Sequence, residues 1–183
     1  MSRASIRDLA VAGALGAACA FGTPIAQAQK SKSTAEAPNP GRHVAAFPGQ
    51  AKDSVKESKT ATGDKVTTHL REFQAGDRYY GTAWTAVPKP PSLAAERAKL
   101  LEVAAAEALK TEPGAKLVSR QKVSLNGIPG VAYVIELPQS KLRLRQQVYL
   151  VAGVLVEQTF SGPAGSETGR ETNRFFDSLK LLP

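Results

Sequence analysis

The residues most suited to chemistry in this sequence are cations that alternate along two segments predicted as strands. They are Lys116, Arg120 and Lys122 on the first segment and Lys141, Arg143 and Arg145 on the second. Alternate residues of a strand point to the same face of a sheet. If the two strands lie close together, six cations gather on one face and can hold an anionic ligand or an acidic partner. The competing interpretation is a solvated sheet edge, where lysines prevent aggregation.

Metal chemistry is not indicated. The sequence contains two histidines, His43 and His69, and a single cysteine, Cys19. The histidines are too far apart for a local ligand pair, so a zinc site would need both of them and a carboxylate brought together by the fold. We expect two solvated imidazoles, no metal site and no cofactor.

Catalytic constellations are also missing from the sequence. There is no Gly-x-Ser-x-Gly motif, and Ser161 lacks the flanking residues of a nucleophile elbow. Glu136 and Glu157 lie in the middle of predicted strands. Glu136 could point into an apolar layer, where burial would raise its pKa, or pair with a basic neighbour across the sheet. We therefore predict no catalytic residue and expect that the protein is not an enzyme.

The first 28 residues have the three parts of a secretory signal peptide. Arg3 and Arg7 supply the positive charge, an apolar stretch follows, and Ala26-Gln27-Ala28 fits the cleavage rule. The apolar stretch is too short for a membrane-spanning helix, which needs about 20 residues. We expect cleavage near Ala28, a periplasmic or secreted mature chain, and no transmembrane anchor in it.

Removal of this leader changes the chemistry of the chain. Arg3, Arg7 and Asp8 leave with it, so the net charge falls from +8 to +7, and the only cysteine is lost. A chain without thiols suits an oxidising compartment. Residues 29–42 are polar, without an apolar period, and we expect a disordered tether there. Residues 43–183 are then a single domain.

Strands and helices alternate in a simple order along this domain. Short strands are expected over 44–47, 52–60, 65–74 and 78–87, and a helix capped by Ser92 runs to about Lys110. Four more strands follow over 115–125, 131–137, 141–151 and 154–160, and a second helix spans 166–177. Asn126-Gly127 is a strong hairpin signal, because a type I′ turn needs positive φ at both central residues. The absence of a βαβ pattern predicts an α+β fold with a mostly antiparallel sheet and two main helices.

Several short motifs resemble those of small exported bacterial proteins of the PsbP/DcrB-like type. They are Phe47-Pro48-Gly49, the segment from Leu125 to Gly130, Arg143-x-Arg145, and Phe176-x-Ser178-Leu179-x-Leu181. The resemblance extends over about residues 43–183 and implies an α-β-α sandwich. Members of this type are mostly uncharacterised, and none of the matched positions is a known catalytic residue.

These observations predict an exported, non-enzymatic binding or accessory protein. Its partner would be an envelope protein or an anionic envelope component. Nucleic acid is not expected, because export separates the protein from it and no aromatic residues are interleaved with the cations. Two alternatives stay open: an exported hydrolase with a dispersed site, and an envelope-associated structural protein.

Overall fold

The computed structural model describes residues 43–60 and 63–182. The predicted signal peptide and tether lie outside these residues. The elements, in chain order, are β1 (His43–Val44), β2 (Lys52–Lys59), β3 (Lys65–Ala75), β4 (Arg78–Ala86), α2 (Ala94–Ala108), β5 (Lys116–Leu125), β6 (Ile128–Leu137), β7 (Leu142–Val151), β8 (Val154–Pro163), the 3₁₀ turn η1 (Ser166–Thr168), α3 (Arg170–Asp177) and β9 (Lys180–Leu181).

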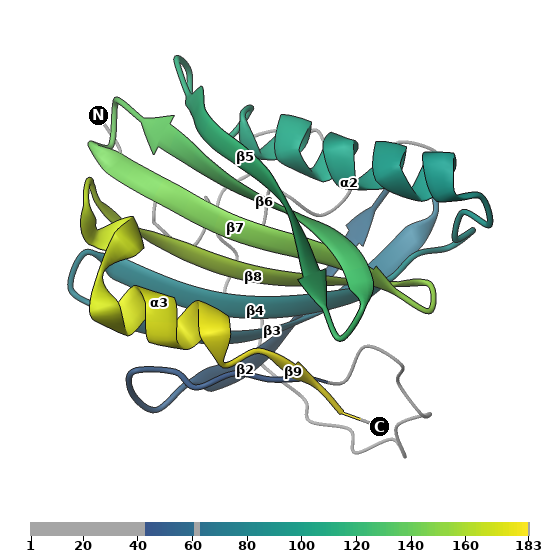
Figure 1. The fold of residues 1–183 in the computed structure, drawn as a ribbon, viewed down its shortest axis with the longest axis horizontal. Helices are drawn as coiled ribbons and strands as arrows, with labels where there is room; N and C mark the ends of the chain where they lie inside the picture. The colour runs from purple at the N-terminus through teal and green to yellow at the C-terminus, as the bar shows by residue number, and fades with distance from the viewer. Residues whose placement is uncertain (1–42, 61–62, 183) are drawn as a thin grey trace.

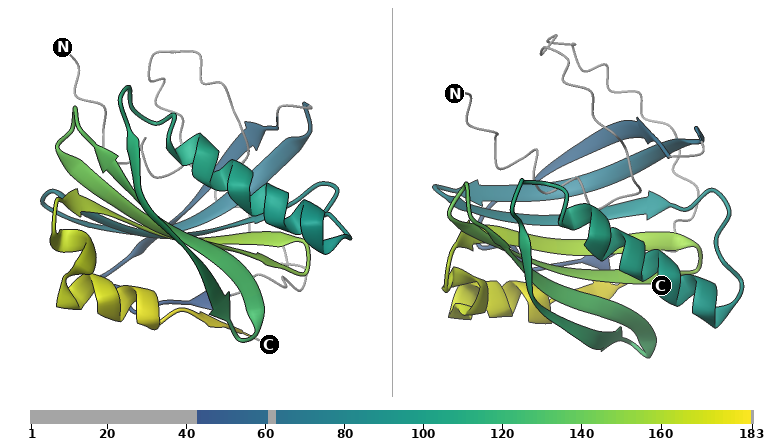
Figure 2. Two further views of the ribbon diagram at one scale, coloured as in Figure 1. Left: turned by 45° about the horizontal axis from the view of Figure 1, so that its top comes forward. Right: turned by 90° about the horizontal axis from the view of Figure 1, so that it is seen from above.

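One antiparallel sheet of seven strands forms the centre of the domain, in the order β2-β3-β4-β8-β7-β6-β5. The two meanders expected from the sequence join where β4 pairs with β8. The sheet is strongly twisted, with α2 on one face and α3 on the other (Figures 1 and 2). The α+β class and the mostly antiparallel sheet are therefore confirmed.

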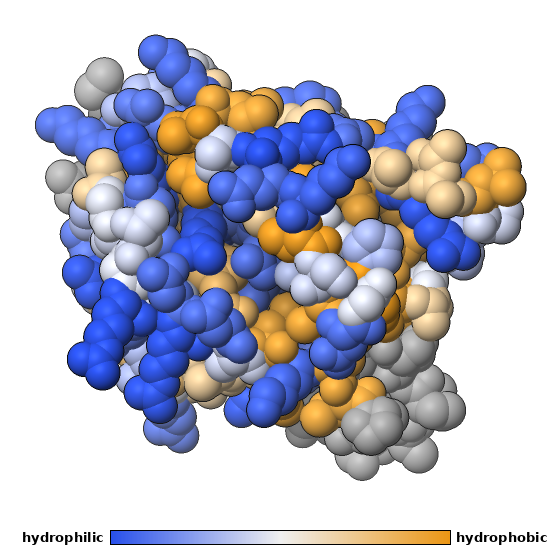
Figure 3. Space-filling view, viewed as in Figure 1, coloured by the Kyte–Doolittle hydropathy of each residue, from blue (hydrophilic) through white to orange (hydrophobic). Residues whose placement is uncertain are grey.

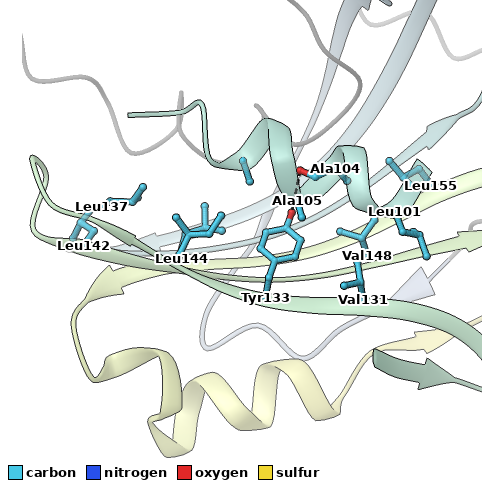
Figure 4. Packing of buried hydrophobic residues seen from close by; sticks show 12 residues of the cluster. Leu101, Ala104, Ala105, Val131, Tyr133, Leu137, Leu142, Leu144, Val148 and Leu155 are labelled. Atoms are coloured by element: carbon cyan, nitrogen blue, oxygen red, sulfur yellow. Dashed lines mark hydrogen bonds between the residues drawn. The ribbon is translucent and has the colours of Figure 1, made fainter. Parts of the chain in front are cut away.

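The core under α2 is built from aliphatic strand residues and the alanines of the helix. The buried residues of α2 are Leu101, Ala104, Ala105 and Ala108, and they lie over β6 and β7. Small alanine side chains let the helix approach closely, and the Tyr133 hydroxyl lies 3.5 Å from the Ala104 carbonyl oxygen (Figure 4).

The opposite face of the sheet carries an aromatic cluster beneath α3. Tyr80 of β4 and Phe160 of β8 meet Phe175 and Phe176 of the helix, with ring centroids 5.1 to 5.4 Å apart. Edge-to-face contacts of this kind favour aromatic packing beyond the area that they bury. This cluster fixes α3 on the sheet.

Three local expectations were wrong. Ser92 does not cap α2: Leu93 holds the N-cap position without a side-chain bond, and the Arg97 guanidinium instead binds the Ser92 carbonyl at 3.1 Å. The spacing of Leu93, Leu100, Leu101, Ala104 and Ala108 predicts that all five lie on one apolar side of this helix, but Leu93 is 62% exposed. The second helix is divided, because the extended backbone of Gly169 separates η1 from α3.

The strand expected over 44–47 is shorter than the sequence suggested. Only His43–Val44 form β1, which pairs with β9 near the C-terminus. The Ala46 amide donates to the Ser178 hydroxyl at 2.7 Å and continues this contact. The start of the domain is therefore held against the segment that follows α3.

Candidate functional site

Arg143 and Arg145 share one face of β7, as their alternation predicts, but that face is covered by η1 and α3. The Arg143 guanidinium donates to the Glu167 carboxylate at 2.7 Å. Arg145 donates to the Glu167 carbonyl at 3.0 Å and to the Asn173 side chain at 2.6 Å. Its guanidinium also lies 4.1 Å from the centre of the Phe176 ring, a cation–π contact. Both arginines therefore attach the C-terminal segment to the sheet.

Burial, hydrogen bonds and neighbouring charges shift the pKa values of Glu167 and Arg145. Burial alone would raise the pKa of Glu167, but the hydrogen bond from Arg143 and two backbone hydrogen bonds lower it. Burial lowers the pKa of Arg145, and the nearby charges of Asp177 and Glu167 oppose that effect. Glu167 was not singled out in the sequence, and its place between Gly165 and Thr168 carries no motif that would identify it.

The expectation that all six cations gather on one face is wrong. A β-bulge at Val118 shifts the register of β5, so Lys116 lies opposite Glu136 on the α3 side of the sheet. After the bulge, Arg120 and Lys122 lie opposite Tyr133 and Val131 and point to the α2 side.

The remaining candidates are also separated. Arg120 forms an ion pair with Glu102 of α2. Lys141 lies in the turn before β7 with a φ of 60° and is exposed. The three β5 cations and the three around β7 therefore do not form a common anion site.

A different group of cations surrounds a hollow beside α3. The hollow has a volume of about 1140 Å³, and it is lined by Val44, Ala45, Ala46, Thr168, Arg170, Asn173, Arg174, Asp177, Ser178 and Lys180. Arg170, Arg174 and Lys180 supply three positive charges against one from Asp177. Figure 3 shows the hydrophilic surface over α3 at the lower left of the molecule.

The lining of this hollow is held in place by the arginines of β7. Asn173 accepts the hydrogen bond from Arg145 and donates to the Thr168 carbonyl at 3.0 Å. Arg170 and Arg174 also border a smaller hollow of about 450 Å³ together with Glu171. The sequence did contain a signal for this site, because Arg170, Asn173, Arg174 and Asp177 have the spacing of one helix face.

A second polar group lies buried in the sheet on the α2 side. Glu157 of β8 is 3% exposed, and its Oε2 accepts a 2.7 Å hydrogen bond from Gln146. The Tyr133 hydroxyl donates to Gln146 Oε1. Glu157 Oε1 has no hydrogen-bond partner among residues 43–60 and 63–182. Burial raises the pKa of Glu157 to about 7, although the Gln146 bond opposes the shift.

Of the two glutamates in the middle of strands, Glu157 is therefore the buried one and not Glu136. Glu136 is exposed and lies in register between Lys116 and Arg143, which agrees with the alternative of basic neighbours. His69 is not a freely solvated imidazole, because its ring stacks on Trp84 with centroids 3.7 Å apart. Within the part of the chain that the structure describes, no three metal-ligating side chains cluster.

Comparison with known proteins identifies no family. No protein-family model matches the sequence, and no curated protein matches it. The resemblance to PsbP/DcrB-like proteins therefore stays a prediction. No helix within residues 43–60 and 63–182 has the length and apolar character needed to span a membrane.

Two solved structures are distantly similar. The protein of unknown function PA94 from Pseudomonas aeruginosa has 16% identity and a TM-score of 0.35, with 68% of this chain and 78% of that chain covered. LpqN of Mycobacterium tuberculosis, involved in cell envelope biogenesis, has 13% identity and a TM-score of 0.39, with 78% of this chain and 91% of that chain covered. Similarity at this distance supports no argument about function.

Proposed function

We propose that this is an exported binding protein of the cell envelope that holds anionic groups of its partner in the hollow beside α3. The observation that carries this proposal is the convergence of Arg170, Arg174 and Lys180 on one concave surface. Among the ion pairs of the described part of the chain, none engages these three side chains. Their charge is available to an anionic ligand.

The polar lining supports recognition in addition to attraction. The hydroxyls of Thr168 and Ser178 already donate to backbone carbonyls of the chain. Asn173 donates one amide hydrogen to the Thr168 carbonyl and has the second one left beside the cations. Carboxylate and phosphate oxygens accept hydrogen bonds from such donors, and charge-assisted bonds to arginine are among the strongest. The predicted leader and the positive charge of the mature chain agree with a partner in the envelope, where anionic polymers and acidic proteins occur.

The ligand chemistry common to these partners is an anionic oxygen, and a flexible acidic chain can follow the open hollow that lies between α3 and the first residues of the domain. Two probes separate the sources. Polyglutamate presents carboxylates on a chain, and phosphatidylglycerol vesicles present phosphates on a surface. We expect the mature chain, residues 29–183, to bind polyglutamate more tightly than the vesicles.

The test is a charge reversal with a matched control. The hollow variant carries Arg170→Glu and Arg174→Glu. The control carries Lys56→Glu and Lys59→Glu on the exposed outer strand β2, and it has the same net charge. We expect the hollow variant to lose about tenfold in affinity for polyglutamate while the control loses much less. Equal losses would show that only net charge matters and would contradict the proposal.

The vesicle measurement separates the proposed binding protein from the alternative of an envelope-associated structural protein. Vesicle binding that is as strong as polyglutamate binding and unaffected by the hollow variant would favour an envelope-associated structural protein. Surface attraction of that kind falls with salt and depends on total charge near the membrane.

A further inference from the structure

The two outer strands of the sheet differ in the protection of their free edges. β2 carries mixed charges, with Lys52, Asp53, Lys56, Glu57 and Lys59 within eight residues. β5 has ten residues, Lys-Leu-Val-Ser-Arg-Gln-Lys-Val-Ser-Leu, and none of them is acidic. An edge strand presents unpaired backbone groups that can bind another strand. β5 is therefore the edge whose own side chains carry charge of one sign only.

Large apolar side chains are exposed on this edge. Leu117 and Val118, at the bulge, are each 46% exposed and adjacent to each other. After the bulge, the register with β6 is regular from Ser119 to Leu125. This seven-residue stretch is long enough to pair with an added strand.

The two faces of this stretch differ in chemistry. Arg120 and Lys122 point to the α2 side, whereas Val123 and Leu125 are half-buried on the other side, against the cluster around Tyr149. A strand added here places its own side chains next to these. It therefore needs acidic residues on the α2 side and apolar residues on the other.

A second copy of this chain is a poor occupant. Pairing β5 with β5 would bring Arg120 and Lys122 close to the same cations of the other copy, and like charges across a strand pair are destabilising. The exposed ion pair of Arg120 with Glu102 does not block an acidic partner, because exposed pairs contribute little and exchange readily.

We propose that the β5 edge binds an extended segment of a partner protein in which acidic and apolar residues alternate. The added strand forms backbone hydrogen bonds with Ser119–Leu125, and its acidic residues meet Arg120 and Lys122. This mode of recognition combines backbone affinity with side-chain selectivity. It uses a surface separate from the hollow beside α3, so it does not depend on the proposed function.

The experiment uses the isotope-labelled mature chain and two synthetic eight-residue peptides. One alternates Glu with Val, and the control alternates Lys with Val. Amide hydrogen exchange is measured for each strand. We expect the Glu–Val peptide to slow exchange within residues 119–125 and to leave the amides of β2 unchanged. Slowed exchange in β2 to the same extent, or none in β5, would overturn the proposal.

A charge-swap variant tests selectivity without removing the edge. Arg120→Glu with Lys122→Glu should bind the Glu–Val peptide about tenfold more weakly and gain affinity for the Lys–Val peptide. Protected β6 amides in the free variant confirm that it is folded. The Arg170→Glu, Arg174→Glu variant should bind the Glu–Val peptide at β5 as the wild type does. A swap variant with unchanged peptide preference would contradict the proposal.

Discussion

Glu157 is the clearest case of a side chain whose environment changes its chemistry. It lies on a central strand, and burial raises its pKa from 4.5 to about 7. Because the native pKa is above the unfolded one, the native state is favoured below pH 4.5 and loses stability as the pH rises through 7. The full loss is roughly 3 kcal/mol, since one pKa unit corresponds to about 1.4 kcal/mol.

Glu157→Gln tests this directly. The variant cannot ionise, so at pH 8 it should be more stable than the wild type by about 3 kcal/mol, and at pH 4.5 the difference should be below about 0.5 kcal/mol. Urea unfolding at both pH values measures it. Glu136→Gln, at an exposed site in the next strand but one, is the control and should keep the wild-type profile. If Glu157→Gln and the wild type show the same pH dependence, Glu157 is not buried as described.

At the residue level, the sequence predicted which side chains share a strand face better than it predicted which elements cover that face. Arg143 and Arg145 do share a face, because strand alternation fixes that. Their burial beneath η1 and α3 depends on Glu167 and Asn173, which lie more than twenty residues later and match no motif. Burial of Glu157 instead of Glu136 likewise depends on which face of the sheet α2 covers.

At the level of elements, Gly130 in β6 is a close-approach site. A Cβ atom there would lie 2.6 Å from the Val148 carbonyl oxygen and would also meet the Tyr149 ring. Gly130→Ala should therefore destabilise the domain by about 1–3 kcal/mol, because the neighbouring backbone cannot move away freely. Thermal unfolding measures this effect. Ser124→Ala, on the adjacent strand and exposed, should change stability little, and an equal effect of both would contradict the packing described here.

Turn chemistry made some elements predictable. Asn126 and Gly127 have φ values of 51° and 81°, as a type I′ hairpin requires. The bulge at Val118 was not predictable, because one extra residue in a strand leaves no mark in composition. It nevertheless reverses the face of Lys116 relative to Arg120 and so undid the expected cation cluster. The pairing of β4 with β8 joins residues far apart in the chain, which local patterns do not encode.

For the whole molecule, the sequence predicts export and removal of residues 1–28. The mature protein should begin at Gln29 and contain no thiol, since Cys19 leaves with the leader. Mass spectrometry of the purified envelope fraction checks the first residue, and a thiol reagent checks the cysteine. An intact chain that retains Cys19 would contradict this prediction.

The central claim is that anionic groups bind between Arg170, Arg174 and Lys180 beside α3. The most direct measurement is a nuclear magnetic resonance titration of the labelled mature chain with polyglutamate, following the arginine side-chain signals. We predict that the signals of Arg170 and Arg174 shift together and saturate, while Arg97 at the start of α2 stays unchanged. Equal, unsaturated shifts of all three arginines would contradict a defined site.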